Sequence, residues 1–240
     1  MVDRARHWAA RWLLWRCTLC GAAGLPGLDL CAACHADLPW NLPSCPGCAQ
    51  PMPPGASDWR CGSCLAHPPA WDAAFSPLRY ALPVDTLIQQ LKFQGQLARA
   101  RLLGDLMAAT LASSRRTPWP KALIPVPLHP TRLRERGFNQ ARELALRLAR
   151  LPGVRLCDDL ARRTRATPPQ VGLTAAARAR NLRGAFAVDG ALPDHVALID
   201  DVLTTGGTLT ALSLALRAAG ASRIEVWTVA RSVPDPQETR

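Results

Sequence analysis

The stretch VALIDDVLTTGGTL, residues 196–209, decides how the C-terminal part of the chain is expected to fold. Four apolar residues precede two adjacent carboxylates, Asp200 and Asp201, and a run of Thr and Gly follows them. Neighbouring carboxylates repel each other and glycines weaken regular structure, so this combination is typical of a functional site. A buried strand that ends in polar residues indicates a parallel sheet, because ligands bind at the carboxyl ends of such strands.

The segments around this stretch alternate between strand and helix patterns. The sequence predicts helices over 86–112, 140–150 and 208–219, and strands over 121–128, 196–200 and 223–230. Asp85 and Asn139 are expected to cap the first two helices, and Gly95 is a weak point in the first. Residues 162–186 are expected to form a loop and a short helix. The strand–helix–strand order at the C-terminus predicts an α/β fold with a parallel sheet.

The turn at 204–208 has the composition of a phosphate-binding loop. It leads into the predicted helix at 208, where free backbone N–H groups and the helix dipole favour an anion. Gly206 and Gly207 let the backbone approach a ligand closely, and the hydroxyls of Thr204, Thr205 and Thr208 add donors. Two carboxylates beside a bound phosphate suit the hydroxyls of its sugar, with a divalent metal offsetting charge.

Other phosphate-binding motifs do not fit the sequence. There is no Walker A lysine, and no G-x-G-x-x-G follows a predicted strand. An acidic pair of the response-regulator kind needs about a hundred further residues for its other functional groups, and 39 residues follow Asp201.

Eight of the nine cysteines fall into four Cys-x-x-Cys pairs within residues 17–64. Two thiolates from one tight turn can bind one metal, and a tetrahedral zinc site needs two such turns. Four pairs therefore predict two structural zinc sites in a module that spans residues 1–70. The simplest pairing joins the first pair to the second and the third to the fourth, although an interleaved pairing is open. The expected ligands are Cys17, Cys20, Cys31, Cys34, Cys45, Cys48, Cys61 and Cys64.

Disulfides and redox motifs are weaker explanations for these cysteines. Nothing in the sequence indicates export, and four clustered pairs exceed what a redox site requires. His35 and His67 follow near Cys pairs, but eight thiolates are enough for two metals. Trp40 and Trp59 are expected to fill the thin core of the module.

The charge of the chain suits a polyanion. The net charge is +11, and residues 131–183 hold thirteen arginines against four acidic residues. Such a region favours phosphates of a small ligand or nucleic acid, although a solvated charged face explains it equally well. No apolar run approaches the ~20 residues of a membrane span, and the basic N-terminus lacks the apolar core of a signal peptide. We expect a cytoplasmic protein without stable membrane insertion.

The stretch ALIDDVLTTGGTL resembles the phosphoribosyl pyrophosphate (PRPP) motif of type I phosphoribosyltransferases. In that family two acidic residues hold the ribose hydroxyls and the Thr/Gly loop holds the 5-phosphate. The resemblance implies a PRPP site with Mg²⁺, in which Asp200 and Asp201 are the catalytic candidates. The implied phosphate ligands are Thr204, Thr205, Gly206, Gly207 and Thr208.

Other segments resemble the ComF (ComFC) family of competence proteins. They are LIQQLKFQG at 87–95, IPVPLHPTRLRERGFNQARELA at 124–145, TPPQVGLTAAARARNLRGAF at 167–186, and the Cys pairs. The resemblance covers about residues 10–232. It implies a small zinc-ribbon-like module over 1–70, followed by a phosphoribosyltransferase-like domain over 71–240. The family is implicated in DNA uptake and in the use of DNA as a nutrient.

By the same analogy, the loop after the first strand, about residues 125–140, meets the pyrophosphate. Arg132, Arg134 and Arg136 could supply charge there, with Arg136 favoured. Lys92 is a further candidate phosphate contact. Arg178, Arg180 and Asn181 are second candidates. Residues 4–16 form a basic amphipathic pattern with three tryptophans, expected to pack on the zinc module rather than on a membrane.

Two functions remain open at this stage. The chain is an enzyme that transfers the phosphoribosyl group of PRPP to an unknown acceptor, or it binds PRPP or a nucleotide as a signal without turnover. In the second case its basic loops and zinc module hold single-stranded DNA or a partner such as a competence helicase. No residue is an obvious general base, so the sequence alone leaves turnover undecided.

Overall fold

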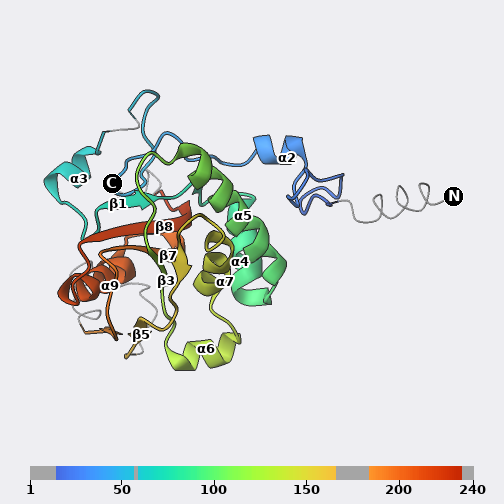
Figure 1. The fold of residues 1–240 in the computed structure, drawn as a ribbon. Coiled ribbons are helices and arrows are strands. Elements are labelled where there is room, and N and C mark those ends of the chain that lie inside the picture. The colour runs from blue at the N-terminus through green and yellow to red at the C-terminus, as the bar shows by residue number, and fades with distance from the viewer. Residues whose placement is uncertain (1–14, 57–58, 166–183, 234–240) are drawn as a thin grey trace, which may run out of the picture. The chain divides into compact units, whose positions relative to one another are not determined.

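The computed structural model describes residues 15–56, 59–165 and 184–233 (Figure 1). Within them the chain divides into two compact units, Met1–Pro39 and Trp40–Arg240. The first unit holds the first two Cys pairs, whereas the other two pairs belong to the same unit as the sheet. The boundary at residue 70 stays a prediction about the extent of the zinc-binding sequence.

The first unit contains one short helix in its described part, α2 (Ala32–Ala36). The helices of the second unit are α3 (Gly62–Ala66), α4 (Val84–Gln94), α5 (Leu97–Ser114), α6 (Pro130–Arg136), α7 (Gln140–Leu148) and α9 (Gly207–Ala218). Its strands are β1 (Ala73–Phe75), β2 (Leu78–Arg79), β3 (Ala122–Pro125), β4 (Arg155–Leu156), β5 (Ala161–Arg163), β6 (Phe186–Val188), β7 (His195–Leu203) and β8 (Arg223–Arg231).

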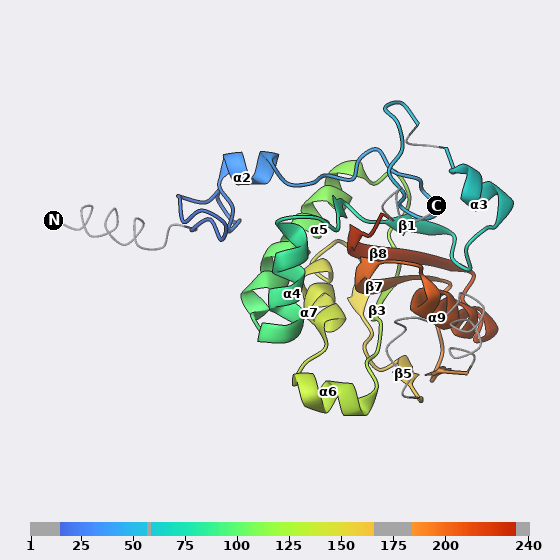
Figure 2. The same cartoon turned by 180° about the vertical axis from the view of Figure 1, so that it is seen from behind.

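The expected α/β fold with a parallel sheet is confirmed. The sheet has the order β1-β8-β7-β3-β4, with β2 also paired to β8, and every pair is parallel. Helices α4, α5 and α7 lie on one side of it and α9 on the other (Figures 1 and 2). Strands β7 and β8 are buried along most of their length, as central parallel strands should be.

The core between α9 and the sheet is built from alternate residues of the central strands. Val196 and Leu198 of β7 pack with Leu209, Leu212 and Leu216 of α9. Because side chains alternate along a strand, Asp200 continues the face of Val196 and Leu198. The strand that fills this core therefore also directs one carboxylate of the pair toward the α9 side.

Three local predictions need correction. The helix expected over 86–112 is two helices, because Gly95 adopts a left-handed φ of 65° and ends α4. Asp85 is not its cap: Pro83 holds that position, and Asp85 lies in the first turn. The basic stretch at 129–138, expected as a turn, contains α6. Pro130 begins this helix, the His129 side chain accepts from the Thr131 N–H, and Gly137 follows its end.

One other prediction is confirmed, one more needs correction, and part of that segment lies outside the described residues. Asn139 caps α7, and its side chain accepts a hydrogen bond from the Ala141 N–H at 3.0 Å. The loop expected at the start of 162–186 is instead strand β5, and the segment ends in β6; the two strands pair antiparallel. The short helix expected there falls on residues 166–183, which the structure does not describe.

A buried ion pair fixes the end of α5 to the sheet. Arg115 donates to both carboxylate oxygens of Glu225 at 2.9 and 3.0 Å, and the Trp227 indole donates to the same carboxylate. Burial raises the pKa of Glu225, but the hydrogen bonds and charge of Arg115 outweigh it, so the pKa is lowered. The ionised carboxylate is thus part of the folded state.

We expect Glu225→Gln to lower the free energy of unfolding by about 3–5 kcal/mol, because Arg115 is left buried without a counter-charge. The stabilisation from Glu225 is present above its unfolded pKa and is lost as pH falls through its lowered folded pKa. Urea denaturation at several pH values measures both effects. As a control, Asp194→Asn breaks an exposed pair with Lys121 and should change stability by less than about 1 kcal/mol. Equal losses of stability in Glu225→Gln and Asp194→Asn would contradict a stabilising role for the buried ion pair of Arg115 and Glu225.

Candidate functional site

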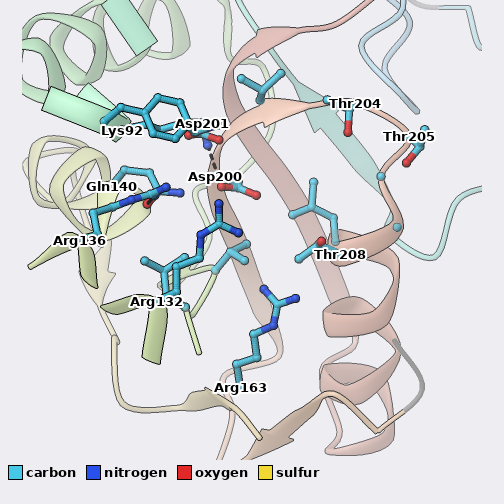
Figure 3. A pocket seen from close by; sticks show the side chains of 17 residues that line it. Lys92, Arg132, Arg136, Gln140, Arg163, Asp200, Asp201, Thr204, Thr205 and Thr208 are labelled. Atoms are coloured by element: carbon cyan, nitrogen blue, oxygen red, sulfur yellow. Dashed lines mark hydrogen bonds and ion pairs between the residues drawn. The ribbon is translucent and has the colours of Figure 1, made fainter. Parts of the chain in front are cut away.

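A cleft of about 280 Å³ opens at the carboxyl ends of β3 and β7, beside the N-terminus of α9 (Figure 3). Its walls come from the end of β7 with the following loop, from α4, from the segment 126–140 and from β5. The predicted residues that line it are Lys92, Arg132, Arg136, Asp200, Asp201, Thr204, Thr205, Gly206, Gly207 and Thr208. The fold therefore brings most of the sequence-predicted site to one place.

The two adjacent carboxylates have different surroundings. Strand β7 continues through both residues to Leu203, so they lie in the strand rather than beyond its end. Asp201 is 4% exposed and its Oδ2 lies 2.7 Å from Nζ of Lys92 on α4. Asp200 is partly buried and points into the cleft toward the Thr/Gly loop (Figure 3). Asp200 is thus the carboxylate better placed to meet a ligand.

The protonation of Asp200 reflects this arrangement. Burial and the neighbouring charge of Asp201 raise the pKa of Asp200 to about 7, although Lys92 and the Asp201 N–H act against the rise. The backbone N–H of Asp201 donates to Asp200 Oδ1 at 2.9 Å. An acid of this kind exchanges a proton near neutral pH, and a bound cation or hydroxyl donor would favour its ionised form.

The loop between β7 and α9 has the geometry expected of an anion site. Thr204 and Thr205 are exposed, and α9 begins at Gly207 with no side chain capping it among the described residues. Gly206 has a φ of 77°, and a Cβ there would lie 2.7 Å from Cη2 of Trp71. Only glycine meets both conditions. Gly206, Gly207 and Thr208 line the cleft, so the first-turn N–H groups of α9, which lack intrahelical partners, border it.

Arginines face this loop across the cleft. Arg132 and Arg136 come from α6, and Arg163 comes from β5; the guanidinium groups of Arg132 and Arg163 point inward (Figure 3). Arg136 donates to the Gln140 side chain and lies 5.8 Å from the Phe93 ring centroid. Burial, followed by the charge of Arg132, lowers the pKa of both Arg136 and Arg163. A bound anion would relieve this crowding of positive charge.

Several predicted contacts have other positions. Lys92 lines the cleft, but its ammonium group is paired with Asp201. Arg134 lies on α6 and is not among the residues that line the cleft. Arg178, Arg180 and Asn181 lie outside the described residues, as do residues 4–14 of the N-terminal amphipathic pattern.

Sequence reasoning missed three residues of the site. Arg163 lies in an Arg-rich run in which the sequence does not distinguish one arginine from another. Gln140 was recognised only as the first residue of a predicted helix. Trp71 was missed because Trp40 and Trp59 were expected to form the module's core. Trp59 is 70% exposed, whereas Trp71 is 6% exposed and packs under the loop.

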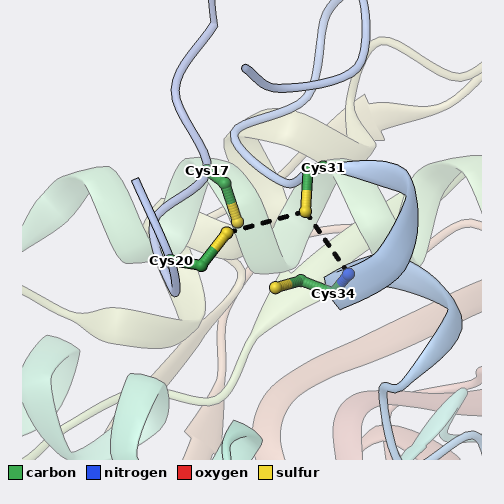
Figure 4. Close-up of side chains that lie close together, drawn as sticks. All are labelled: Cys17, Cys20, Cys31 and Cys34. Atoms are coloured by element: carbon green, nitrogen blue, oxygen red, sulfur yellow. Dashed lines mark hydrogen bonds between the residues drawn. The ribbon is translucent and has the colours of Figure 1, made fainter. Parts of the chain in front are cut away.

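The four Cys pairs form two separate groups with the simplest of the possible pairings. In each group the four Sγ atoms lie within 4.8 Å of one another. Among the described residues, both groups consist of cysteines alone, so His35 and His67 are not ligands in them. The groups are Cys17, Cys20, Cys31 and Cys34 (Figure 4), and Cys45, Cys48, Cys61 and Cys64.

Both groups fit a tetrahedral zinc ion. Zn–S bonds of about 2.3 Å place sulfurs about 3.8 Å apart, close to the 3.7 Å of Cys20–Cys31 and the 3.6 Å of Cys48–Cys61. The N–H groups of Gly47 and Cys61 donate to Cys45 Sγ at 3.4 and 3.2 Å. Burial raises the pKa of the Cys45 thiol, but the backbone N–H groups dominate and lower it to about 7, which favours the thiolate that a metal needs.

Cys157, the ninth cysteine, is partly buried and packs against the core between α9 and the sheet. This agrees with its expected role as a small core residue.

Known proteins resemble this chain over nearly its full length. Competence protein F of Haemophilus influenzae is 35% identical over 225 residues, which cover 90% of this chain and 97% of that protein. The chain belongs to the ComF family of competence proteins. DNA utilization protein YhgH of Escherichia coli K12 is 34% identical over 227 residues, covering 92% of this chain and 97% of that protein.

The N-terminal part of this ComF protein matches a second description. Residues 12–65 match the double zinc ribbon domain, which agrees with the two Cys groups. A purine phosphoribosyltransferase from Pyrococcus horikoshii Ot3 aligns with a TM-score of 0.32 and 18% identity, over 57% of this chain and 84% of that chain. No helix among the described residues is long and apolar enough to cross a membrane.

Two zinc ions per chain are expected in protein purified without chelators, one for each Cys group. Replacing Cys17 and Cys20 with serine should remove one, and replacing Cys45 and Cys48 should remove the other. Elemental analysis by mass spectrometry counts the metal in each protein. A wild-type content near zero, or loss of both ions from either pair of substitutions, would contradict two independent sites.

Proposed function

We propose that this ComF protein binds PRPP with Mg²⁺ in the cleft and serves DNA uptake or DNA utilisation as a phosphoribosyltransferase-like protein. One observation carries the proposal: the Asp200 carboxylate faces an open helix N-terminus with a Thr/Gly loop, inside one cleft that arginines close on the other side. The names of its relatives, competence protein F and DNA utilization protein, support the biological role. A cytoplasmic location is part of the proposal.

Each part of the ligand has a matching group in the cleft. The 5-phosphate lies on the N–H groups that begin α9, with the hydroxyls of Thr204, Thr205 and Thr208 around it. The ribose hydroxyls donate to Asp200, and Asp201 borders the same site while Lys92 neutralises it. Arg132, Arg136 and Arg163 face the pyrophosphate, which Arg can bind in a bidentate manner.

The chain's own residues would act by position and charge. Arginines that grip the pyrophosphate stabilise the negative charge that develops as it leaves the ribose. The loop and Asp200 hold the sugar so that an acceptor can approach C1. Mg²⁺, when bound, would neutralise part of the charge of the pyrophosphate.

Binding without turnover is the second candidate function. No histidine, cysteine or tyrosine is among the described residues that line the cleft, so no side chain of these types is available there to accept the acceptor's proton. Incubation with PRPP, Mg²⁺ and a mixture of nucleobases, followed by a pyrophosphate assay, separates the two functions. Released pyrophosphate supports transfer. Bound PRPP without release supports a PRPP-sensing accessory protein that acts with single-stranded DNA or a competence helicase.

Asp200→Asn should abolish PRPP binding measured by isothermal titration calorimetry, while the protein stays folded. Because the folded state disfavours the ionised form of Asp200, the substitution should leave the melting temperature unchanged or higher. Asp201→Asn leaves Lys92 without its partner and should cost about 1–3 kcal/mol of stability. Unchanged PRPP affinity in Asp200→Asn would refute the site.

PRPP affinity should also depend on pH through Asp200. Its raised pKa means that the carboxylate needed by the ribose hydroxyls is the major form only above about pH 7. Affinity should therefore rise by up to about tenfold per pH unit below pH 7 and level off above it. Titration calorimetry from pH 5.5 to 8.5 in two buffers of different ionisation enthalpy reports the proton release. A flat profile with no proton release would contradict the assigned role of Asp200.

A further inference from the structure

One buried side chain connects the second Cys group to the phosphate loop. The Trp71 indole N–H donates to the carbonyl of Gly47, inside the Cys45–Cys48 turn, at 2.7 Å. The opposite end of the same ring lies against Gly206, where a Cβ would be 2.7 Å from Cη2. A shift of the Cys45–Cys48 turn would therefore move the ring that supports the start of α9.

A second side chain connects the same two parts of the molecule. The Arg231 guanidinium, at the end of β8, donates to the carbonyls of Leu203 and Thr204 at 2.7 and 2.6 Å. Burial lowers the pKa of Arg231, and negative charge on Cys48, Cys61 and Cys64 acts against that lowering. A zinc ion with four thiolates carries a net charge of about −2, so Arg231 would compensate a negative centre while it holds the loop.

The second Cys group is itself anchored to the sheet. The Ala74 N–H of β1 donates to the Pro46 carbonyl at 2.8 Å, and Arg60 donates to the Asp72 carbonyl at 2.8 Å. The position of the Cys45–Cys48 turn relative to the sheet is thus fixed at several points. The Trp71 and Arg231 contacts then transmit that position to the loop at 203–206.

We propose that metal binding at Cys45, Cys48, Cys61 and Cys64 is coupled to anion binding at the β7–α9 loop, with Trp71 and Arg231 as the positioning residues. The metal orders the turn, and the two side chains hold the loop in the conformation that receives a phosphate. Coupling of this kind is reciprocal, so a bound phosphate retains the second metal more strongly. The identity of the ligand rests on the proposed function, whereas the ordering of the loop by the second Cys group does not.

The test compares full-length zinc-loaded proteins. Cys48→Ser with Cys61→Ser disrupts the second group, and Cys20→Ser with Cys31→Ser disrupts the first as the matched control. Trp71→Phe keeps an aromatic ring but loses the N–H bond to Gly47 and the far end of the indole that lies against Gly206, and Trp59→Phe alters an exposed indole as its control. Arg231→Gln removes the charge at the loop. Elemental analysis and thermal melts accompany every variant.

Hydrogen exchange of the amides at 203–209 gives a readout that needs no ligand. We expect faster exchange there when the second group is disrupted, and in Trp71→Phe and Arg231→Gln with both zinc ions still bound. The two controls should match the wild type. Unchanged exchange in Trp71→Phe and Arg231→Gln would overturn the proposal, even if the cysteine variants fail to fold.

Calorimetry with PRPP and Mg²⁺, and with pyrophosphate alone, gives the second readout. Disruption of the second group should weaken binding by about tenfold, as is typical of coupled sites, and Trp71→Phe by about threefold. Conversely, PRPP should slow zinc loss to a chelating dye from the second group only. Equal affinity in all variants would overturn the coupling. A wild-type protein that binds neither PRPP nor pyrophosphate would refute the PRPP site and the coupling to anion binding, and the exchange differences would then support only the ordering of the loop by the second Cys group.

Discussion

The ion pair between Lys92 and Asp201 allows two adjacent carboxylates to stand at the end of one buried strand. Without a counter-charge, Asp201 would be a buried anion beside a second one, and both would favour protonation. With Lys92 at 2.7 Å from Asp201, only Asp200 remains to be balanced by a ligand. The cleft thus separates two roles that look identical in sequence: one acid is satisfied inside the protein, and its neighbour is left with a raised pKa at the surface of the site.

The wall of the cleft that faces the loop at 204–208 has the opposite charge, because it is lined by arginines. Burial and the charge of Arg132 lower the pKa of Arg136 and of Arg163, and the three arginines reach the cleft from two separate elements. Asp200 acts against this lowering in both arginines, and Asp201 does so in Arg136, but the pKa of each remains lowered. A polyanionic ligand would satisfy both walls at once, because it brings phosphates to the arginines and a sugar to Asp200.

The fold class and most of the residues around the cleft could be predicted from the sequence, because the patterns that indicate them lie within short segments of the chain. Strand and helix patterns, the Thr/Gly loop and the Cys spacing each depend on neighbours in the chain, so they could be read directly. Tertiary packing decided the rest. The burial of Asp201 depends on a lysine more than a hundred residues away, and Arg163 enters the site through a two-stranded sheet that the sequence did not indicate. Helix α6 was missed because its arginines leave no apolar stripe, and Gly95 ended a helix that periodicity alone would continue.

The division of the chain has a consequence for work with fragments. The unit that contains the sheet begins at Trp40, so it includes the second Cys group together with Trp71. A fragment that starts at residue 71 would keep every cleft-lining residue and still lack the turn on which the Trp71 indole rests. Removal of the whole cysteine-rich sequence would therefore also remove the turn that supports the ligand loop through Trp71. Removal of the residues up to Pro39 would leave that support in place.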